Sequence, residues 1–167
     1  MAFDLESVLD DVNWRILEEL QENARLSYAE LGRRVGLTSP AVAERVRRLE
    51  EAGIITAYRL EIDPSKVGLP LTAFVRIATS GEGKYEHVLN VVRDRPEVQE
   101  CHRVTGADSY FLKVIVSSVQ HLQEFLERLV PYGQPTTSIV LSSPVTHRVI
   151  GPPAPNQPPP SPPSRRR

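Results

Sequence analysis

The sequence predicts an α+β fold, with a helical N-terminal part and a second part of order βαββαβ. Apolar residues recur at helical spacing as far as Ala52, and patterns of period two follow. Between them, the segment EIDPSKVGLP interrupts regular structure with two prolines and a glycine. We therefore expect two domains, 1–62 and 71–150, joined by a linker at 63–70.

Composition predicts an ordinary soluble chain. Of its 167 residues, 40% are hydrophobic, enough to bury real cores, and the formal net charge is only −1. No apolar run is long enough to span a membrane, and residues 1–11 lack a basic stretch typical of a signal peptide. The single cysteine, Cys101, excludes an internal disulfide and a cysteine-based zinc cage. We expect a cytoplasmic protein without membrane contact.

The last segment, 151–167, differs in composition from the rest of the chain. It holds eight prolines and no large apolar side chain, so we predict a disordered tail. The three arginines at 165–167 leave weak contact with nucleic acid as the alternative.

The first predicted helix follows Asp10 and Asp11, which can cap its start, and runs to about Asn23. Its apolar positions recur at helical spacing and are Val12, Ile16, Leu17 and Leu20.

Two further helices follow, separated by a tight turn. Ser27 and Glu30 have the spacing of a capping box, which predicts that the second helix begins here. Gly36 can adopt the left-handed conformation that ends this helix. Thr38 is a good N-cap for a third helix reaching Ala52.

This order of helix, glycine turn and helix is typical of a helix-turn-helix, whose second helix enters a DNA major groove. Residues 25–48 carry six arginines against two glutamates, although the chain is nearly neutral. On a helical wheel Arg47 and Arg48 lie opposite the apolar positions Val42, Val46 and Leu49. The candidate DNA contacts are Ser27, Tyr28, Thr38, Ser39, Pro40, Ala43, Glu44, Arg45, Arg47 and Arg48.

Two alternatives remain open for this charged surface. The stretch ERVRRLEE is also typical of an ordinary solvated helix face. Arg45 lies nearer the apolar stripe, so a phosphate contact or an ion pair within the protein suits it as well as base recognition. Arg47 and Arg48 are the stronger candidates.

The segment 54–62 alternates apolar and polar residues, so we predict a strand that serves as a wing or as an arm to the second domain. In that domain we predict helices whose apolar stripes cover one face of an antiparallel sheet, and the other face is then open to dimerisation or to a ligand. The predicted elements are strands at 71–78, 98–105, 110–116 and 137–141 and helices at 84–94 and 119–129.

Four stretches together resemble the leucine-responsive/asparagine-regulator (Lrp/AsnC) family of prokaryotic transcription regulators, over about residues 9–142. They are LDDVNWRILEELQENARLSYAELGRRVGLTSPAVAERVRRLEEAGIITAY, VGLPLTAFVRI, CHRVTG and TTSIVLS. The resemblance implies a winged helix-turn-helix followed by a ferredoxin-like effector domain. It also implies double-stranded DNA as partner, dimers built through the sheet and often assembled into octamers, and a place at the nucleoid.

The resemblance further implies an effector, usually an amino acid, bound between effector domains near the loop TGADSYF. The family pattern is glycine, two variable residues and aspartate, whereas here the aspartate comes one position earlier. For the three hydroxyl residues at 136–138, simple turn chemistry after Gly133 is the alternative. The candidate effector contacts are Gly106, Asp108, Ser109, Tyr110, Thr136, Thr137 and Ser138.

We do not expect an enzyme, a metal site or a cofactor. GADSY lacks the Gly-x-Ser-x-Gly pattern of a nucleophile elbow, and the four histidines are scattered. Cys101 and His102 would point to opposite faces of a strand. Together with the helix-turn-helix pattern, the resemblance implies a sequence-specific DNA-binding regulator of amino-acid-related metabolism that responds to a small effector. The alternative is a sensor or protein-interaction module that does not bind DNA, and salt-sensitive duplex binding would separate the two.

Overall fold

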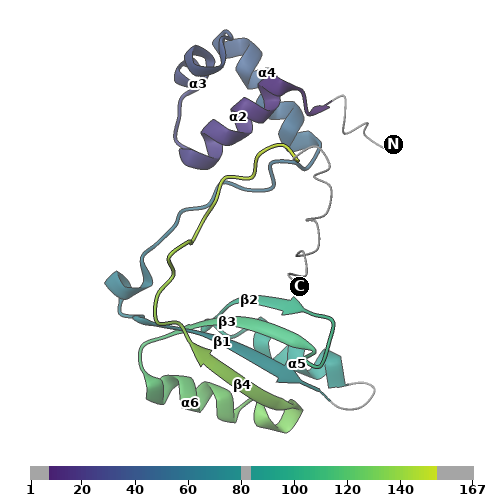
Figure 1. Cartoon of the computed structure of the whole chain (residues 1–167), viewed down its shortest axis with the longest axis vertical. Helices are drawn as coiled ribbons and strands as arrows, with labels where there is room; N and C mark the ends of the chain where they lie inside the picture. The colour runs from purple at the N-terminus through teal and green to yellow at the C-terminus, as the bar shows by residue number, and fades with distance from the viewer. Residues whose placement is uncertain (1–7, 80–83, 154–167) are drawn as a thin grey trace, which may run out of the picture. The chain divides into compact units, whose positions relative to one another are not determined.

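A computed structural model of the chain describes residues 8–79 and 84–153. Contacts within the chain divide it into two compact units (Figure 1). The helical unit comprises Met1–Leu60 with Val145–Arg167, and the sheet unit comprises Glu61–Pro144. The domain limits 1–62, 63–70, 71–150 and 151–167 remain a prediction, and most of the predicted tail, 154–167, lies outside the described residues.

The helical unit contains the three predicted helices, α2 (Asp11–Glu22), α3 (Tyr28–Val35) and α4 (Ser39–Glu51). Their apolar stripes meet in one core. Its fully buried members are Leu31 and four of the positions that helical spacing indicated, Ile16, Val42, Val46 and Leu49.

Local chemistry sets the limits of these helices. The Asp10 side chain accepts a 2.7 Å hydrogen bond from the Asn13 backbone N–H at the start of α2. Ser27 and Glu30 form the predicted capping box at the start of α3, and Gly36 ends that helix with φ 76°. Thr38 is the N-cap of α4 as predicted, although its side chain makes no capping hydrogen bond.

The strand predicted at 54–62 is absent from the described chain, and this prediction is wrong for the single chain. Ile54 and Ile55 pack on the helical core, whereas Tyr58 and Leu60 are exposed. Alternation favours a strand only where a neighbouring strand completes the hydrogen-bond ladder, and none of the described segments pairs with this one.

A C-terminal segment also packs in the helical unit. The Gln21 side-chain amide donates to the Ile150 carbonyl at 3.0 Å, and its oxygen accepts from the Ile150 N–H at 2.9 Å. Ile150 and Trp14 help to line a hollow of about 400 Å³ beside α2. This contact follows from no pattern in the sequence.

The sheet unit has the predicted order βαββαβ. Its antiparallel sheet has the strand order β2-β3-β1-β4. The elements are β1 (Leu71–Ala78), α5 (Lys84–Arg93), β2 (Val98–Arg103), β3 (Tyr110–Val116), α6 (Val119–Glu127) and β4 (Gln134–Ile139), with short 3₁₀ turns η1 (Pro64–Val67) and η2 (Val130–Tyr132).

Both α5 and α6 lie on one side of the sheet (Figure 1). Alternate side chains of the two central strands are buried beneath them, among them Val75, Leu112 and Tyr110. The opposite side, called the open face below, carries Phe74, Arg76, Phe111, Lys113, Thr136 and Ser138. The α+β fold class is confirmed.

β4 begins three residues earlier than the predicted strand at 137–141. Gly133 and Pro135 favoured a turn here, but among the described strands β4 pairs with β1 alone and so forms one edge of the sheet. Proline, which lacks an N–H, is tolerated in an edge strand.

Candidate nucleic-acid interface and effector site

The outer side of α4 carries most of the predicted DNA contacts. Val42, Val46 and Leu49 are fully buried. The opposite residues, Arg47 and Arg48, have 54% and 68% of their side-chain surface exposed. The wheel therefore correctly separated the core side of α4 from its outer side.

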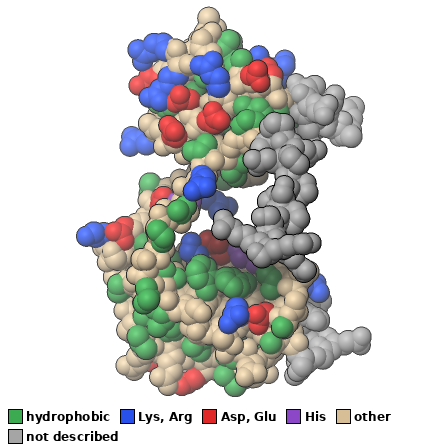
Figure 2. Space-filling view, in the orientation of Figure 1, with side chains coloured by type: hydrophobic (Ala, Val, Ile, Leu, Met, Phe, Trp, Pro, Cys, Tyr) green, Lys and Arg blue, Asp and Glu red, His purple; other side chains and the backbone are tan. Residues whose placement is uncertain are grey.

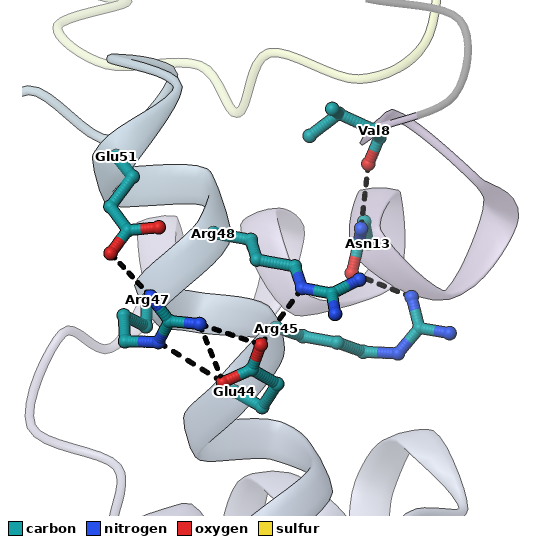
Figure 3. Close-up of polar contacts among 7 residues, drawn as sticks. All are labelled: Val8, Asn13, Glu44, Arg45, Arg47, Arg48 and Glu51. Atoms are coloured by element: carbon teal, nitrogen blue, oxygen red, sulfur yellow. Dashed lines mark hydrogen bonds and ion pairs between the residues drawn. The ribbon is translucent and has the colours of Figure 1, made fainter.

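Glutamates hold these two arginines (Figure 3). Arg47 Nη2 lies 2.7 Å from Glu44 Oε1 and Arg47 Nε lies 3.0 Å from Glu44 Oε2. Arg47 Nη1 also donates to Glu51 Oε1. The hydrogen bonds that Arg47 donates to Glu44 and then to Glu51 raise the pKa of Arg47. Arg48 Nε donates to Glu44 Oε1 at 2.9 Å.

Glu44 is consequently shared by two guanidinium groups. Hydrogen bonds from Arg47 and then Arg48 hold the pKa of the Glu44 carboxyl below its usual range. Basic and acidic side chains are interspersed on the visible surface of the helical unit, as Figure 2 shows. Glu44 was predicted from the sequence as a DNA contact. Its position three residues before Arg47 and four before Arg48 was the sequence signal for these ion pairs.

Arg45 has a different environment. Its Nη1 lies 2.7 Å from Asp10 Oδ2 and 3.0 Å from Asn13 Oδ1. Asn13 is buried, and its amide donates to the Val8 carbonyl at 2.6 Å. Among the roles left open for Arg45, the structure shows an ion pair within the protein. This pair joins α4 to the start of α2.

The remaining DNA candidates lie at the N-terminal ends of α3 and α4. Ser27 uses its hydroxyl in the capping box, accepting from the Glu30 N–H at 3.2 Å. Tyr28 is 42% exposed. Ser39 and Pro40 are exposed in the first turn of α4, whereas Ala43 is half-buried. Whether each contacts DNA remains a prediction.

Two of the candidate effector residues, Asp108 and Thr136, lie near Arg76 of β1. Gly106 has φ 115°, a conformation that favours glycine. Asp108 Oδ2 lies 3.7 Å from Arg76 Nη1, a partner that the sequence analysis missed. Thr136 stands opposite Arg76 in the β1–β4 register, on the open face.

The structure does not bring all seven effector candidates together. Tyr110 is 1% exposed in the core beneath the helices, and Thr137 is paired with Val75, whose side chain faces the same core. The Ser109 hydroxyl lies 2.7 Å from the Thr79 hydroxyl. Gly106, Asp108, Thr136 and Ser138 remain on the loop and the open face.

In the part of the chain that the structure describes, no group of three or more His, Cys, Asp or Glu residues is arranged to hold a metal ion. None of the helices in that part is long and apolar enough to span a membrane.

Comparison with known proteins identifies both units. Residues 9–50 match the AsnC-type helix-turn-helix domain and residues 72–150 match the Lrp/AsnC ligand binding domain. The chain is 40% identical to the HTH-type transcriptional regulator LrpC of Bacillus subtilis over 134 residues, which cover 80% of this chain and 92% of LrpC.

Solved structures agree with these matches. The structure of Bacillus subtilis LrpC has a TM-score of 0.79 and 37% identity, and the match covers 83% of this chain and 99% of that one. A transcriptional regulator of Neisseria meningitidis in complex with L-Met has a TM-score of 0.80 and 31% identity, with coverage of 85% and 96%. The matched proteins are regulators and not enzymes. The chain therefore belongs to the Lrp/AsnC family and is a DNA-binding transcriptional regulator with a ligand-binding domain.

Proposed function

We propose that the outer side of α4 enters the major groove and that Arg47 and Arg48 are its principal DNA contacts. The observation that carries this proposal is the division of α4 into a fully buried apolar side and an exposed side rich in arginine. Arginine can bind guanine with two hydrogen bonds, and it also neutralises phosphate. Ser39 and Pro40, exposed in the first turn, are suitably placed for contacts beside them.

The test is titration of the full chain with duplex DNA at several salt concentrations. Arg47→Ala and Arg48→Ala should each weaken binding. Loss of an arginine that reads a base should cost about 1–3 kcal/mol of binding free energy at one base pair. Loss of a phosphate contact should instead weaken binding to all sequences alike and lower the slope of affinity against salt by about one. Arg128→Ala, a substitution on the sheet unit, is the control. Unchanged binding by both α4 variants would show that the DNA face lies elsewhere.

An amino acid is the proposed effector. Arg76 and Asp108 present opposite charges 3.7 Å apart, which suits the carboxylate and ammonium groups of a free amino acid. The Thr136 hydroxyl, opposite Arg76 in the sheet, would add a hydrogen bond. The L-Met complex of the Neisseria meningitidis regulator supports this class of ligand. Genes of amino-acid metabolism are the corresponding targets.

The proposed assembly is a dimer built through the open face, with octamers as the larger form. Phe74 and Phe111 lie on this face with ring centroids 5.2 Å apart. A sheet face that carries aromatic side chains and is left uncovered commonly buries them against a second copy. As a DNA-bound regulator the protein would work in the prokaryotic cytoplasm at the nucleoid.

A further inference from the structure

We propose that Glu44 determines DNA specificity, by neutralising Arg47 and Arg48 away from the correct site and by accepting a hydrogen bond from a cytosine amino group within it. The proposal rests on the DNA-binding side of α4 proposed above. It assigns to a carboxylate the discrimination between sequences, and to the two arginines most of the attraction to DNA.

The geometry around Glu44 carries the first half of this inference. Its two oxygens accept four hydrogen bonds from the two arginines, between 2.7 and 3.0 Å long. Arg47 reaches it from one turn along the helix with both Nε and Nη2, and Arg48 approaches the same carboxylate with Nε (Figure 3). The guanidinium groups of Arg47 and Arg48 are thus both bound to the Glu44 carboxylate.

Electrostatics explains why this arrangement suppresses binding to the wrong DNA. Non-specific affinity comes almost wholly from phosphate neutralisation by cations. A carboxylate between two arginines competes with phosphate for them and repels it. Exposed ion pairs are weak, so the arginines can still exchange Glu44 for DNA when other contacts favour it.

The proposed cytosine contact follows from what the Glu44 carboxylate requires once the arginines have left it for DNA. Glu44 can only accept hydrogen bonds, and its side chain is 44% exposed between the two arginines. In the major groove the cytosine amino group is the donor that a glutamate typically accepts. At a base pair that presents only acceptors, the carboxylate loses water and gains no partner. Glu44 should therefore favour cytosine at one position of each half-site.

Glu51 provides a matched control on the same helix. It also contacts Arg47, but it has no hydrogen bond to Arg48 among the described contacts and lies at the last position of α4. The other charged neighbours on this side, Arg45 and Asp10, are paired with each other. Glu51→Gln removes a negative charge without removing the shared carboxylate.

The experiment compares two duplexes of equal length, one selected from a random pool by the full wild-type chain and one with a scrambled sequence. Glu44→Gln should bind the scrambled duplex about fivefold more tightly, the effect of releasing arginines from a weak pair. Its ratio of selected to scrambled affinity should fall about tenfold. Glu51→Gln should tighten both duplexes alike and keep the ratio.

Single base-pair substitutions in the selected duplex locate the cytosine. The wild type should prefer cytosine at one position per half-site, and both Glu44→Gln and Glu44→Ala should lose the preference there. Circular dichroism checks that each variant folds. An unchanged ratio in both Glu44 variants would overturn the inference. If Arg47→Ala and Arg48→Ala also leave binding unchanged, the DNA face itself is wrong, whereas if they weaken binding, only the role of Glu44 fails.

Discussion

Arg45 differs from the arginines beside it because its charge is used inside the protein. It bridges Asp10, the N-cap of α2, and the buried Asn13. Helical spacing placed Arg45 near the apolar stripe, but the partner residues lie more than 30 positions earlier in the chain and belong to another helix. Sequence reasoning therefore left its role open, and only the packing of α4 on α2 decides it.

Replacing Arg45 should destabilise the helical unit. Arg45→Ala leaves the buried Asn13 side-chain oxygen without this donor, which costs roughly 1–3 kcal/mol in the free energy of unfolding. Urea unfolding followed by circular dichroism measures the loss. Arg25→Ala, an exposed arginine in the loop after α2, should change stability by less than about 0.5 kcal/mol. Equal effects of the two substitutions would contradict a structural role for Arg45.

The same contact predicts a dependence on pH. Burial raises the pKa of Asp10, but the hydrogen bonds from Arg45 and the Asn13 N–H outweigh it and leave the pKa below the usual 3.8. The folded state thus holds Asp10 deprotonated more firmly than the unfolded chain does. This stability is fully present above about pH 4 and is lost as the pH falls through the folded pKa. In Arg45→Ala, the free energy of unfolding should fall less steeply than in the wild type as the pH is lowered below about 4.

At the scale of elements, the helices could be predicted because local chemistry sets their limits. The errors concern strands, because strands depend on pairing between distant segments. The capping box and the glycine at Gly36 each act within a few residues, so the limits of α3 could be derived from its own sequence. The strand expected at 54–62 needed a partner strand that the chain does not supply. The start of β4 depended on its being an edge strand, which is a property of the whole sheet.

Two glycines of the helix-turn-helix, one inside α3 and one at the turn that follows it, have different requirements. Gly36 needs its left-handed backbone and has open space around it. Gly32 lies within α3, and an added Cβ there would clash with the Leu37 carbonyl oxygen. The Leu37 N–H also donates to the Gly32 carbonyl at 2.8 Å, so the chain after α3 passes close to this residue.

We expect Gly32→Ala to destabilise the helical unit by about 1–3 kcal/mol through this clash, although helix propensity alone would favour alanine by about 1 kcal/mol. Gly36→Ala should cost about 1–2 kcal/mol because of its backbone conformation, and Gly36→Asn should cost less. Thermal unfolding compares the three. Because Leu37 lies just before α4, the clash at Gly32 should displace α4, so Gly32→Ala should also weaken DNA binding. A fully stable Gly32→Ala protein would show that the turn is not so closely packed.

At the scale of the whole molecule, one helix-turn-helix contacts few base pairs, so a regulator needs two copies. Two reading helices about 34 Å apart would fit successive turns of a pseudo-palindromic site. We expect a dimer or a larger assembly at micromolar concentration, measured by sedimentation velocity. Phe111→Asp, which places a charge on the open face, should yield monomers with weaker operator binding. A wild-type monomer that still protects a two-fold site would contradict this assembly.

Effector control requires that the ligand bind one assembly or conformation more tightly than another. The coupling is typically worth about 1–3 kcal/mol, and it must be reciprocal, so DNA must change the affinity for the effector by the same factor. Asp108 faces Arg76 at 3.7 Å in the sheet unit, whereas the proposed DNA contacts lie in the helical unit. Asp108→Ala should therefore abolish the amino-acid response and leave DNA binding without ligand near that of the wild type.

Calorimetry of the full chain against a panel of free amino acids, L-Met included, tests this prediction. Any amino acid that binds the wild type should bind Asp108→Ala much more weakly, while Asp94→Ala, a carboxylate just after α5, should bind it normally. DNA titrations with and without that amino acid then give the coupling, because the shift in DNA affinity must equal the shift in ligand affinity. Equal ligand affinity in both variants would remove Asp108 from the site, and a panel without binding would point to a regulator whose ligand is not an amino acid.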